Sequence, residues 1–187
     1  MHTTCYRCLA IALICLLIKS NTLAQCGTER WAVKTLQDDE VAEINFTPLK
    51  STVHKQLQFK KPIYHDDNPR DASEKRVYQL DCILIKYKVE ADKDWHLLVQ
   101  DLETNEQMVV EIPDPQCDEV KGNPRFNKLA LIRKRLVARV GPVKTGFRKP
   151  PANTRLRITG VGFFDKPNHP VGFKGRELHP VIDLAIL

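Results

Sequence analysis

Several familiar signatures of catalytic and nucleotide-binding sites are missing from this sequence of 187 residues. No GxSxG stretch is present, so a serine nucleophile on a strand-to-helix turn is not indicated. A glycine-rich phosphate loop and a dinucleotide fingerprint are also missing, and no two histidines have the HExxH spacing of a helical zinc site. The usual sequence arguments for a serine hydrolase, an NTPase, a dehydrogenase or a zinc protease therefore do not apply. We accordingly expect no cofactor and no metal.

Cysteine is scarce after the first 15 residues, where only Cys26, Cys82 and Cys117 remain. These three show neither the CxxC spacing of a thiol-exchange protein nor the close spacing of a zinc knuckle. In an oxidising compartment two of the three are expected to form a disulfide. Three pairings are possible, and the sequence does not choose among them.

Long apolar runs are limited to one, from Leu9 to Ile18. Arg7 precedes the run, and small residues occupy positions −3 and −1 of a cleavage point, at Thr22 and Ala24. Residues 1–24 are therefore predicted to be a signal peptide that is cleaved before Gln25. Ten apolar residues are short for a membrane span. We expect an extracytoplasmic protein, periplasmic or secreted, with no membrane span after cleavage. An uncleaved anchor is one alternative, and a lipoprotein modified at Cys26 is another.

Acidic residues are rare in the last third of the chain. Residues 121–187 hold roughly 15 basic and 3 acidic side chains, whereas residues 25–120 hold roughly 12 basic and 20 acidic ones. A basic half of this kind can attract anionic partners. The alternative is that it neutralises the acidic half of the same chain.

The pattern of apolar residues predicts two regions after the leader. Residues 25–78 read as an irregular arm, interrupted by prolines and partly packed on the following domain, with Trp31 in a short strand or docking segment. Residues 79–187 show period-2 alternation typical of strands, and one apolar stripe with helical spacing. The expected strands cover residues 80–89, 95–101, 107–112, 154–164 and 178–187, and the expected helix runs from Pro124 to Gly141.

This order, three strands, a helix and two strands, is that of a five-stranded OB barrel. The predicted fold is therefore mainly β with one helix: a small OB-like barrel preceded by an irregular arm. Another small barrel or a strongly bent sheet is the alternative. Pro180 predicts a bulge or an edge position, and Gly160 and Gly162 predict a bend or close packing at a barrel corner.

Five blocks lie along the sequence after the leader: CGTERWAVKT, DWHLLVQD, MVVEIPDPQC, RLRITGVGFFD and ELHPVIDL. Together these blocks resemble a family of small, uncharacterised exported bacterial proteins. The resemblance implies an exported bacterial protein and no particular activity. The chain departs from the family in the loop after GVGFFD, where a histidine–glycine pair is expected and residues 166–170 read KPNHP.

The candidate ligand residues lie in the fourth strand and in the loop that follows it. Arg155 and Arg157 alternate on one face of the strand, and the loop 165–176 carries cations and one aromatic ring that suit phosphate binding and stacking. The set is Arg155, Arg157, Lys166, His169, Phe173, Lys174 and Arg176. A solvated loop and a solvated strand face are the alternatives. The sequence predicts a non-enzymatic module that binds an anionic polymer, either nucleic acid or an acidic glycan.

The sequence is also compatible with two other functions. A phosphodiester hydrolase would use His169 or His179 with Asp165, because histidine shuttles protons near neutral pH. The wider set for such chemistry is His96, His169 and His179 with Asp101, Asp165, Glu177 and Asp183. Each histidine also has a purely structural alternative. A partner protein would instead dock the arm onto another envelope component.

Overall fold

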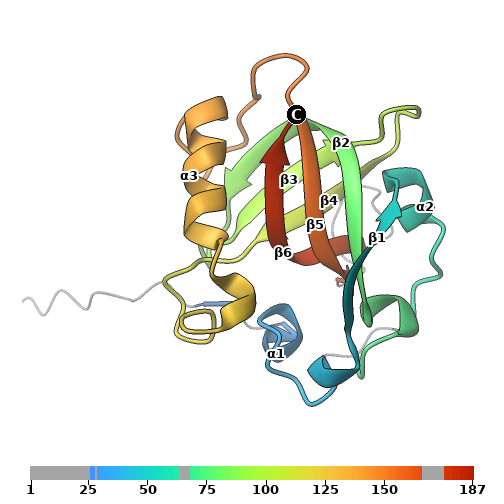
Figure 1. The fold of residues 1–187 in the computed structure, drawn as a ribbon. Helices are drawn as coiled ribbons and strands as arrows, with labels where there is room; N and C mark the ends of the chain where they lie inside the picture. Colours follow the sequence, from blue (N-terminus) through green and yellow to red (C-terminus); the bar gives the residue numbers. More distant parts are fainter. Residues whose placement is uncertain (1–25, 28, 64–67, 166–174) are drawn as a thin grey trace, which may run out of the picture.

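A closed five-stranded barrel forms the body of the molecule in the computed structural model, which describes residues 26–27, 29–63, 68–165 and 175–187. The predicted leader lies outside these residues. The barrel strands are β2 (Arg76–Val89), β3 (Trp95–Gln100), β4 (Gln107–Ile112), β5 (Arg155–Phe164) and β6 (Arg176–Ile186). They pair in the order β2-β3-β4-β6-β5, and β5 pairs with β2 to close the ring (Figure 1). The predicted OB-like barrel is confirmed.

The length of β2 allows the closure. Its first half pairs with β5, from Val77 to Ile83, and its second half pairs with β3, from Ile83 to Val89. The register shifts between Leu84 and Lys86, where a bulge bends the strand. Leu80, Leu84 and other alternating side chains point into the core, as the period-2 pattern requires.

The helix between the third and fourth barrel strands begins in two steps. A 3₁₀ turn, η3 (Pro124–Phe126), precedes α3 (Leu129–Val140). The Asn123 side chain accepts a hydrogen bond from the Arg125 N–H, as an N-cap does. Gly141 ends α3 at a φ of 84°, which a side chain would strain. Figure 1 shows α3 on one side of the barrel and the short helix α2 on the opposite side.

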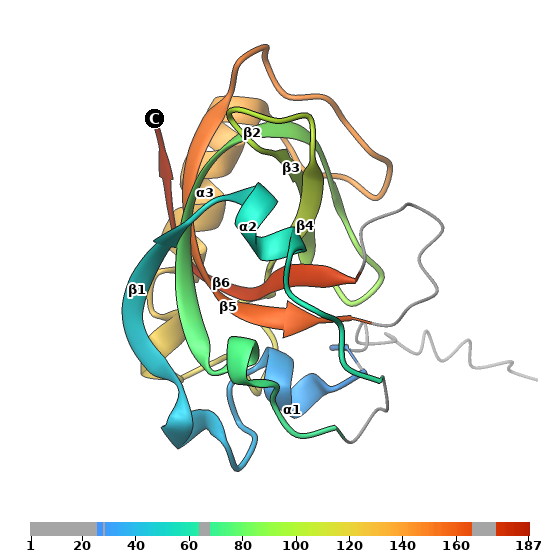
Figure 2. The ribbon, with the colours of Figure 1, turned by 90° about the vertical axis from the view of Figure 1, so that its right-hand side faces the viewer.

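The arm before the barrel contains short elements that pack on it. They are α1 (Trp31–Lys34), η1 (Val41–Glu43), β1 (Asn45–Ser51), α2 (Val53–Leu57) and η2 (Ala72–Glu74). β1 pairs in parallel with β2 as a sixth strand, and the two lie side by side in Figure 2. Val53 and Leu57 of α2 join the main core. Of the two alternatives predicted for Trp31, the short strand is wrong, because this residue begins the helical turn α1.

One disulfide ties the start of the arm to the loop after β4. It joins Cys26 to Cys117, 91 positions later, while Cys82 is a buried thiol. Burial raises the pKa of the Cys82 thiol well above its ordinary value, so this cysteine is unreactive. In the described part of the chain no helix has the length and apolar character needed to cross a bilayer. The disulfide is compatible with an extracytoplasmic protein.

A bulge in β6 lies opposite two glycines of β5, where the two strands approach each other closely. Gly160 pairs with Val181 and Gly162 with Leu178, so β6 carries one extra residue in the stretch that includes Pro180. A Cβ on Gly160 would lie 3.0 Å from the Leu178 Cβ and 3.0 Å from the Pro180 oxygen. The bulge and the close packing predicted here are both confirmed.

Candidate functional site: a buried histidine and carboxylate cluster

Three adjacent strands place a histidine, a glutamate and a second histidine on the outer face of the barrel, the face that points away from the barrel interior. On β3, β4 and β6 the residues Leu97, Val110 and Leu178 point into the core. Because side chains alternate along a strand, their neighbours point outward. His96 and Glu111 are direct cross-strand partners, and the parallel register of Val110 with Leu178 brings Glu111 beside His179.

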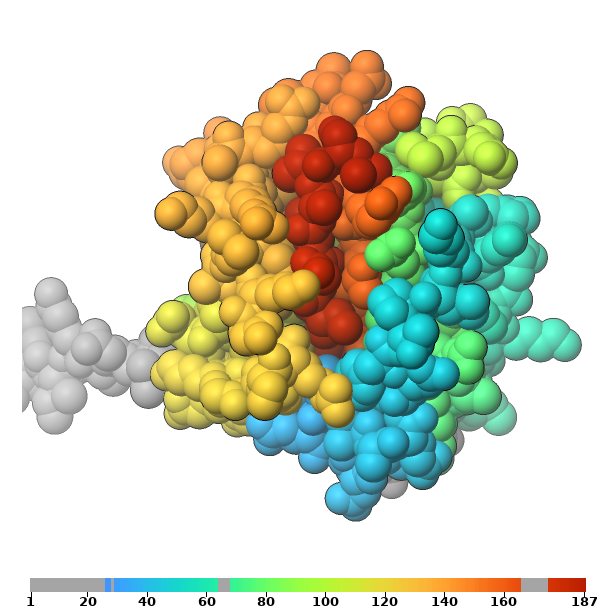
Figure 3. Space-filling view, in the orientation of Figure 1, coloured from blue at the N-terminus to red at the C-terminus, as the bar shows by residue number. Residues whose placement is uncertain are grey.

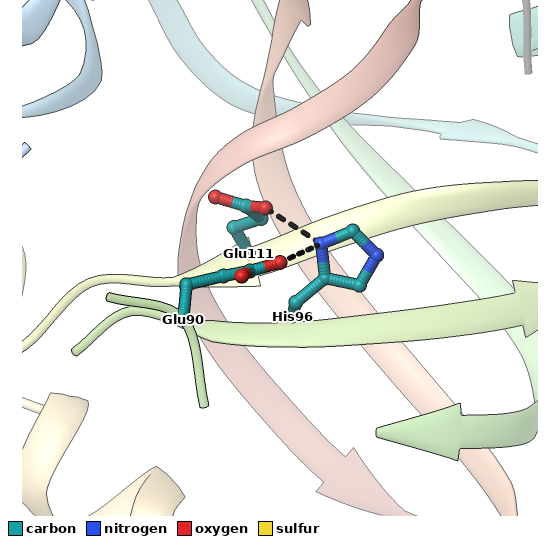
Figure 4. A group of neighbouring side chains, drawn as sticks. All are labelled: Glu90, His96 and Glu111. Atoms are coloured by element: carbon teal, nitrogen blue, oxygen red, sulfur yellow. Dashed lines mark hydrogen bonds and ion pairs between the residues drawn. The ribbon is translucent and has the colours of Figure 1, made fainter. Parts of the chain in front are cut away.

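These side chains form a continuous series of contacts with two carboxylates from the β2–β3 turn. Glu111 Oε1 lies 2.9 Å from His96 Nδ1, and Glu90 Oε1 lies 3.1 Å from the same nitrogen (Figure 4). The other oxygen of Glu111, Oε2, lies 3.1 Å from His179 Nδ1. His179 Nε2 in turn lies 3.3 Å from Asp94 Oδ2. Carboxylate and imidazole therefore alternate from Glu90 to Asp94.

The two ends of the series differ in burial. The side chains of Glu90 and His96 are 29% and 13% exposed, whereas His179 and Asp94 are fully buried. His96 is hydrogen-bonded to Glu111. Neither ring nitrogen of His179 makes a hydrogen bond, and neither does Asp94 Oδ2, although the charged groups are close. Buried polar atoms are normally hydrogen-bonded, so this end of the cluster is unusual.

The carboxylates keep both imidazoles charged. Burial lowers the pKa of His179, but Asp94 and Glu111 outweigh this effect and raise it to about 9. Burial likewise opposes the effect of Glu111 and Glu90 on His96, whose pKa also rises to about 9. The pKa of Glu111 falls well below its ordinary value because the two histidines outweigh its burial. Near neutral pH both imidazoles are therefore protonated and positively charged.

A lysine and another glutamate extend the charged region toward the arm. Glu177 of β6 is buried, and burial together with Glu111 and Asp165 raises its pKa to about 8. Lys34 of α1 is also buried, yet nearby carboxylates raise its pKa. Its ammonium group lies 5.4 Å from the centre of the Phe163 ring. Helix α1, whose chain is anchored by the Cys26–Cys117 disulfide, therefore brings a cation to a carboxylate-rich site.

A basic and aromatic surface borders the exposed end of the cluster. Phe147, in the segment between α3 and β5, is 47% exposed. The ammonium groups of Lys86 and Lys88 lie 4.2 and 4.7 Å from its ring centre. The centres of the Phe147 and His96 rings are 5.7 Å apart, in an edge-to-face arrangement. The backbone of this segment is held against β2, because Arg148 and Tyr87 exchange two hydrogen bonds. Figure 3 shows the segment after α3 at the molecular surface.

Arg176 requires a correction. It was predicted to offer a surface cation, but its side chain is fully buried at the barrel opening. The guanidinium donates to Gln56 Oε1 from Nε and Nη2, at 3.1 and 2.8 Å, and to Ser73 Oγ at 3.1 Å. Three aromatic rings surround it. The alternation of β6 explains the difference, because Arg176 shares the inward parity of Leu178.

Arg155 and Arg157 lie on the outer face of β5 and are exposed, while Leu156 between them is in the core. Arg157 makes a bidentate ion pair with Asp81 of β2, and both N–O distances are 2.7 Å. It borders a shallow pocket of about 160 Å³ that Lys50 and Asp101 also line. Lys166, His169, Phe173 and Lys174 lie outside the described residues. Their predicted role stays a prediction.

The cluster includes residues that sequence reasoning missed. His96, His179 and Glu177 belonged to the set considered for acid–base chemistry, but Glu90, Asp94 and Glu111 did not. The signal was the outward parity of Glu111 on an otherwise apolar strand. The contact between Glu111 and His179 also depends on the parallel register of β4 and β6, and the periodicity of the sequence does not predict that register.

The chain matches no known family model, and no curated protein or solved structure shows significant similarity to it. The resemblance to exported bacterial proteins therefore stays a prediction.

Proposed function

We propose that this protein is an exported binding module for an anionic polymer, with single-stranded nucleic acid as the best-fitting class. The observation that carries the proposal is the exposed Phe147 ring with Lys86 and Lys88 against it. Bases stack on exposed aromatic rings, and neighbouring cations hold the phosphates. The ring lies beside β2 and β3, the first and second strands of the barrel, and the second strand belongs to the face of an OB barrel that commonly binds polymers.

The charge of the surrounding surface supports the same ligand. No acidic residue occurs between Lys121 and Phe164. Exposed cations lie along α3, along the segment after it and at the start of β5. They are Lys134, Arg135, Arg139, Lys144, Arg148, Lys149 and Arg155. An acidic glycan would use the same cations, but it has no base to stack on Phe147. The two ligands should therefore respond differently to loss of the ring.

A salt titration of binding tests the proposal. Labelled single-stranded DNA and an acidic polysaccharide are each titrated with the purified protein at several salt concentrations. Binding of DNA should weaken steeply with salt, because condensed counterions are released on binding. Phe147→Ala should weaken DNA binding by about 1–3 kcal/mol. Leu131→Ala, which truncates another exposed apolar side chain, should leave it unchanged.

The cations are tested with a matched pair of lysines. Lys86→Gln should weaken binding and flatten its salt dependence, whereas Lys55→Gln on α2 should do neither. Binding that does not respond to salt, or that survives loss of Phe147, would refute the stacking surface. Tighter binding of the polysaccharide than of DNA would assign the site to a glycan instead.

A phosphodiester hydrolase is the second candidate. The observation in its favour is that buried Glu177 has a pKa of about 8 and lies near His179, so that it retains a transferable proton at neutral pH. His179→Ala should then abolish turnover of a phosphodiester by a protein that remains folded. Unchanged turnover would remove His179 from the mechanism.

The cellular setting belongs to the same proposal. The disulfide and the predicted leader support export from a bacterial cell, to the periplasm or the medium. An envelope protein remains a possible partner of the arm. Fractionation of cells that express the full chain tests export, and a shortened N-terminus in the exported protein would identify the cleavage point.

A further inference from the structure

We infer that Asp94, Glu111 and His179 form a binding site for one divalent transition-metal ion of the zinc type. One ligand atom from each residue lies within 4.8 Å of the other two. Imidazole nitrogen and carboxylate oxygen are the donors that zinc and its neighbours accept alongside sulfur. The ion lies in the buried part of the cluster, whereas the Phe147 ring of the proposed polymer site meets the exposed end of the cluster at His96.

The buried atoms without hydrogen bonds point to an ion. Both ring nitrogens of His179 and the Oδ2 atom of Asp94 are buried and make no hydrogen bond. Their ion-pair contacts at 3.1 and 3.3 Å lack hydrogen-bond geometry, and buried polar atoms cost free energy unless a well-placed partner satisfies them. The contacts of His179 with Glu111 and Asp94 use different ring nitrogens, so the ion takes one nitrogen and displaces its proton. At Nδ1, the N–O distance of 3.1 Å to Glu111 is close to the separation of about 3.3 Å between two ligands of a tetrahedral ion with bonds near 2.05 Å, and Asp94 then turns its carboxylate toward the same ion.

The outer part of the cluster behaves differently. Glu90, His96 and Glu111 are also close enough to hold an ion, but His96 Nδ1 is hydrogen-bonded to Glu111 at 2.9 Å, whereas neither nitrogen of His179 has a hydrogen bond. The effect of His96 is to hold Glu111 in place, with Oε2 presented to His179. Groups that orient a metal ligand in this way tune affinity without contacting the ion. His96 is therefore a positioning residue.

The protein scaffold supports the site from two further directions. The other oxygen of Asp94, Oδ1, accepts a hydrogen bond from the Asp114 N–H at 2.8 Å, which fixes the carboxylate. The partly exposed side chains of Glu90 and His96 adjoin Glu111 and provide a polar path from solvent. A carboxylate donor set with one imidazole favours zinc, cobalt or manganese over copper(I), which prefers sulfur.

Metal analysis of the protein tests the site. Protein purified from cells that express the full chain is stripped with a chelator and titrated with Zn²⁺ and with Co²⁺. We expect one ion per chain, a higher melting temperature with Zn²⁺, and a visible absorption band from bound Co²⁺. Nuclear magnetic resonance of the wild-type protein should show the ring protons of His179 shifting on Zn²⁺ addition, a result that needs no variant to fold.

Conservative variants locate the ion. Asp94→Asn and Glu111→Gln should lose at least about 100-fold in affinity, while His96→Gln should lose about 10- to 100-fold. His54→Gln is the matched control, because His54 also lies against a carboxylate, Glu106, but on the surface. It should bind Zn²⁺ as the wild type does. Circular dichroism confirms that each variant is folded.

Three results would overturn the inference. The first is folded wild-type protein that binds none of Zn²⁺, Co²⁺ and Mn²⁺. The second is unchanged affinity in folded Asp94→Asn. The third is complete loss of Zn²⁺ binding in His96→Gln while Asp94→Asn keeps its Zn²⁺ affinity. That result would place the ion at the outer histidine, His96. Polymer binding is measured separately on the metal-free protein, so failure of one proposal does not decide the other.

Discussion

Gly162 and Arg176 show how single residues close one opening of the barrel. A Cβ on Gly162 would collide with the backbone oxygen of Ser73 and with the guanidinium of Arg176. The missing side chain thus provides the space in which the arginine is buried. Arg176 keeps its charge, although burial lowers its pKa to about 10 against the effect of Tyr78, Glu74 and Asp71.

Gly162→Ala should lower the free energy of unfolding by about 1–3 kcal/mol, because the added methyl group overpacks a rigid backbone contact. Urea denaturation measures the change. Gly146→Ala is the control, since a Cβ there has nothing within 4 Å, and its stability should be equal or slightly higher. Equal stability of Gly162→Ala and wild type would mean that the opening is loosely packed.

Arg176→Met should also destabilise the protein, by at least about 1–3 kcal/mol, because Gln56 and Ser73 lose their buried hydrogen-bond donor. Arg155→Met, at an exposed position of β5, should change stability by no more than about 0.5 kcal/mol. Thermal and urea unfolding of both variants distinguish the two arginines. A stable Arg176→Met protein with weakened polymer binding would instead restore the surface role that the sequence suggested.

At the scale of elements, Asp101 joins helix α2 to the turn between β3 and β4. Its Oδ2 accepts a hydrogen bond from the His54 N–H at 2.9 Å. Its Oδ1 accepts from the N–H groups of Glu103 and Thr104 at 3.0 and 3.2 Å. Burial alone would raise the pKa of this carboxyl, but the three N–H groups lower it below its ordinary value. The arm thereby depends on a charge at the end of a barrel strand.

Asp101→Asn should cost about 1–2 kcal/mol near neutral pH. A carboxyl with a lowered pKa stabilises the fold above its unfolded pKa of about 3.9, and this contribution is lost as the pH falls. The difference between wild type and Asp101→Asn should therefore shrink below about pH 4. Urea unfolding across the acid range tests this, with exposed Glu103→Gln as the control. A difference that stays constant with pH would show that the charge is unimportant.

At the scale of the whole molecule, the disulfide and the barrel closure both join distant parts of the chain. The Cys26–Cys117 bond closes a loop with a sequence separation of 91 residues. A long loop of this kind restricts the unfolded chain strongly, and the expected stabilisation is about 2–5 kcal/mol. The bond also keeps α1, and Lys34 with it, against the cluster.

Reduction should therefore lower the melting temperature of the wild-type protein. Cys82→Ala should respond to reductant as the wild type does, because Cys82 is a free buried thiol. The double variant Cys26→Ser/Cys117→Ser should melt at the lower temperature with or without reductant. If reduction leaves the wild-type melting temperature unchanged, the disulfide contributes no stability.

Much of the fold was predictable because it depends on local patterns. Alternating side chains defined the strands β3 and β4 to within one residue, and Asn123, Pro124 and Gly141 defined the helix between the third and fourth barrel strands. The order of these elements was enough to suggest the OB-like barrel. The arm was less predictable, since α1, β1 and α2 are short and depend on contacts with the barrel rather than on their own periodicity.

The sequence by itself determined the element order, the basic last third and the outward parity of His96 and Glu111, because each is a property of neighbouring residues. Only the tertiary structure decided which cysteines pair, that Arg176 turns inward, and that His179 lies between Glu111 and Asp94. These outcomes depend on strand register and barrel closure, which bring together residues as far apart as Gln56 and Arg176, 120 positions from each other. No local pattern carries that information, because register is fixed by the packing of the whole core.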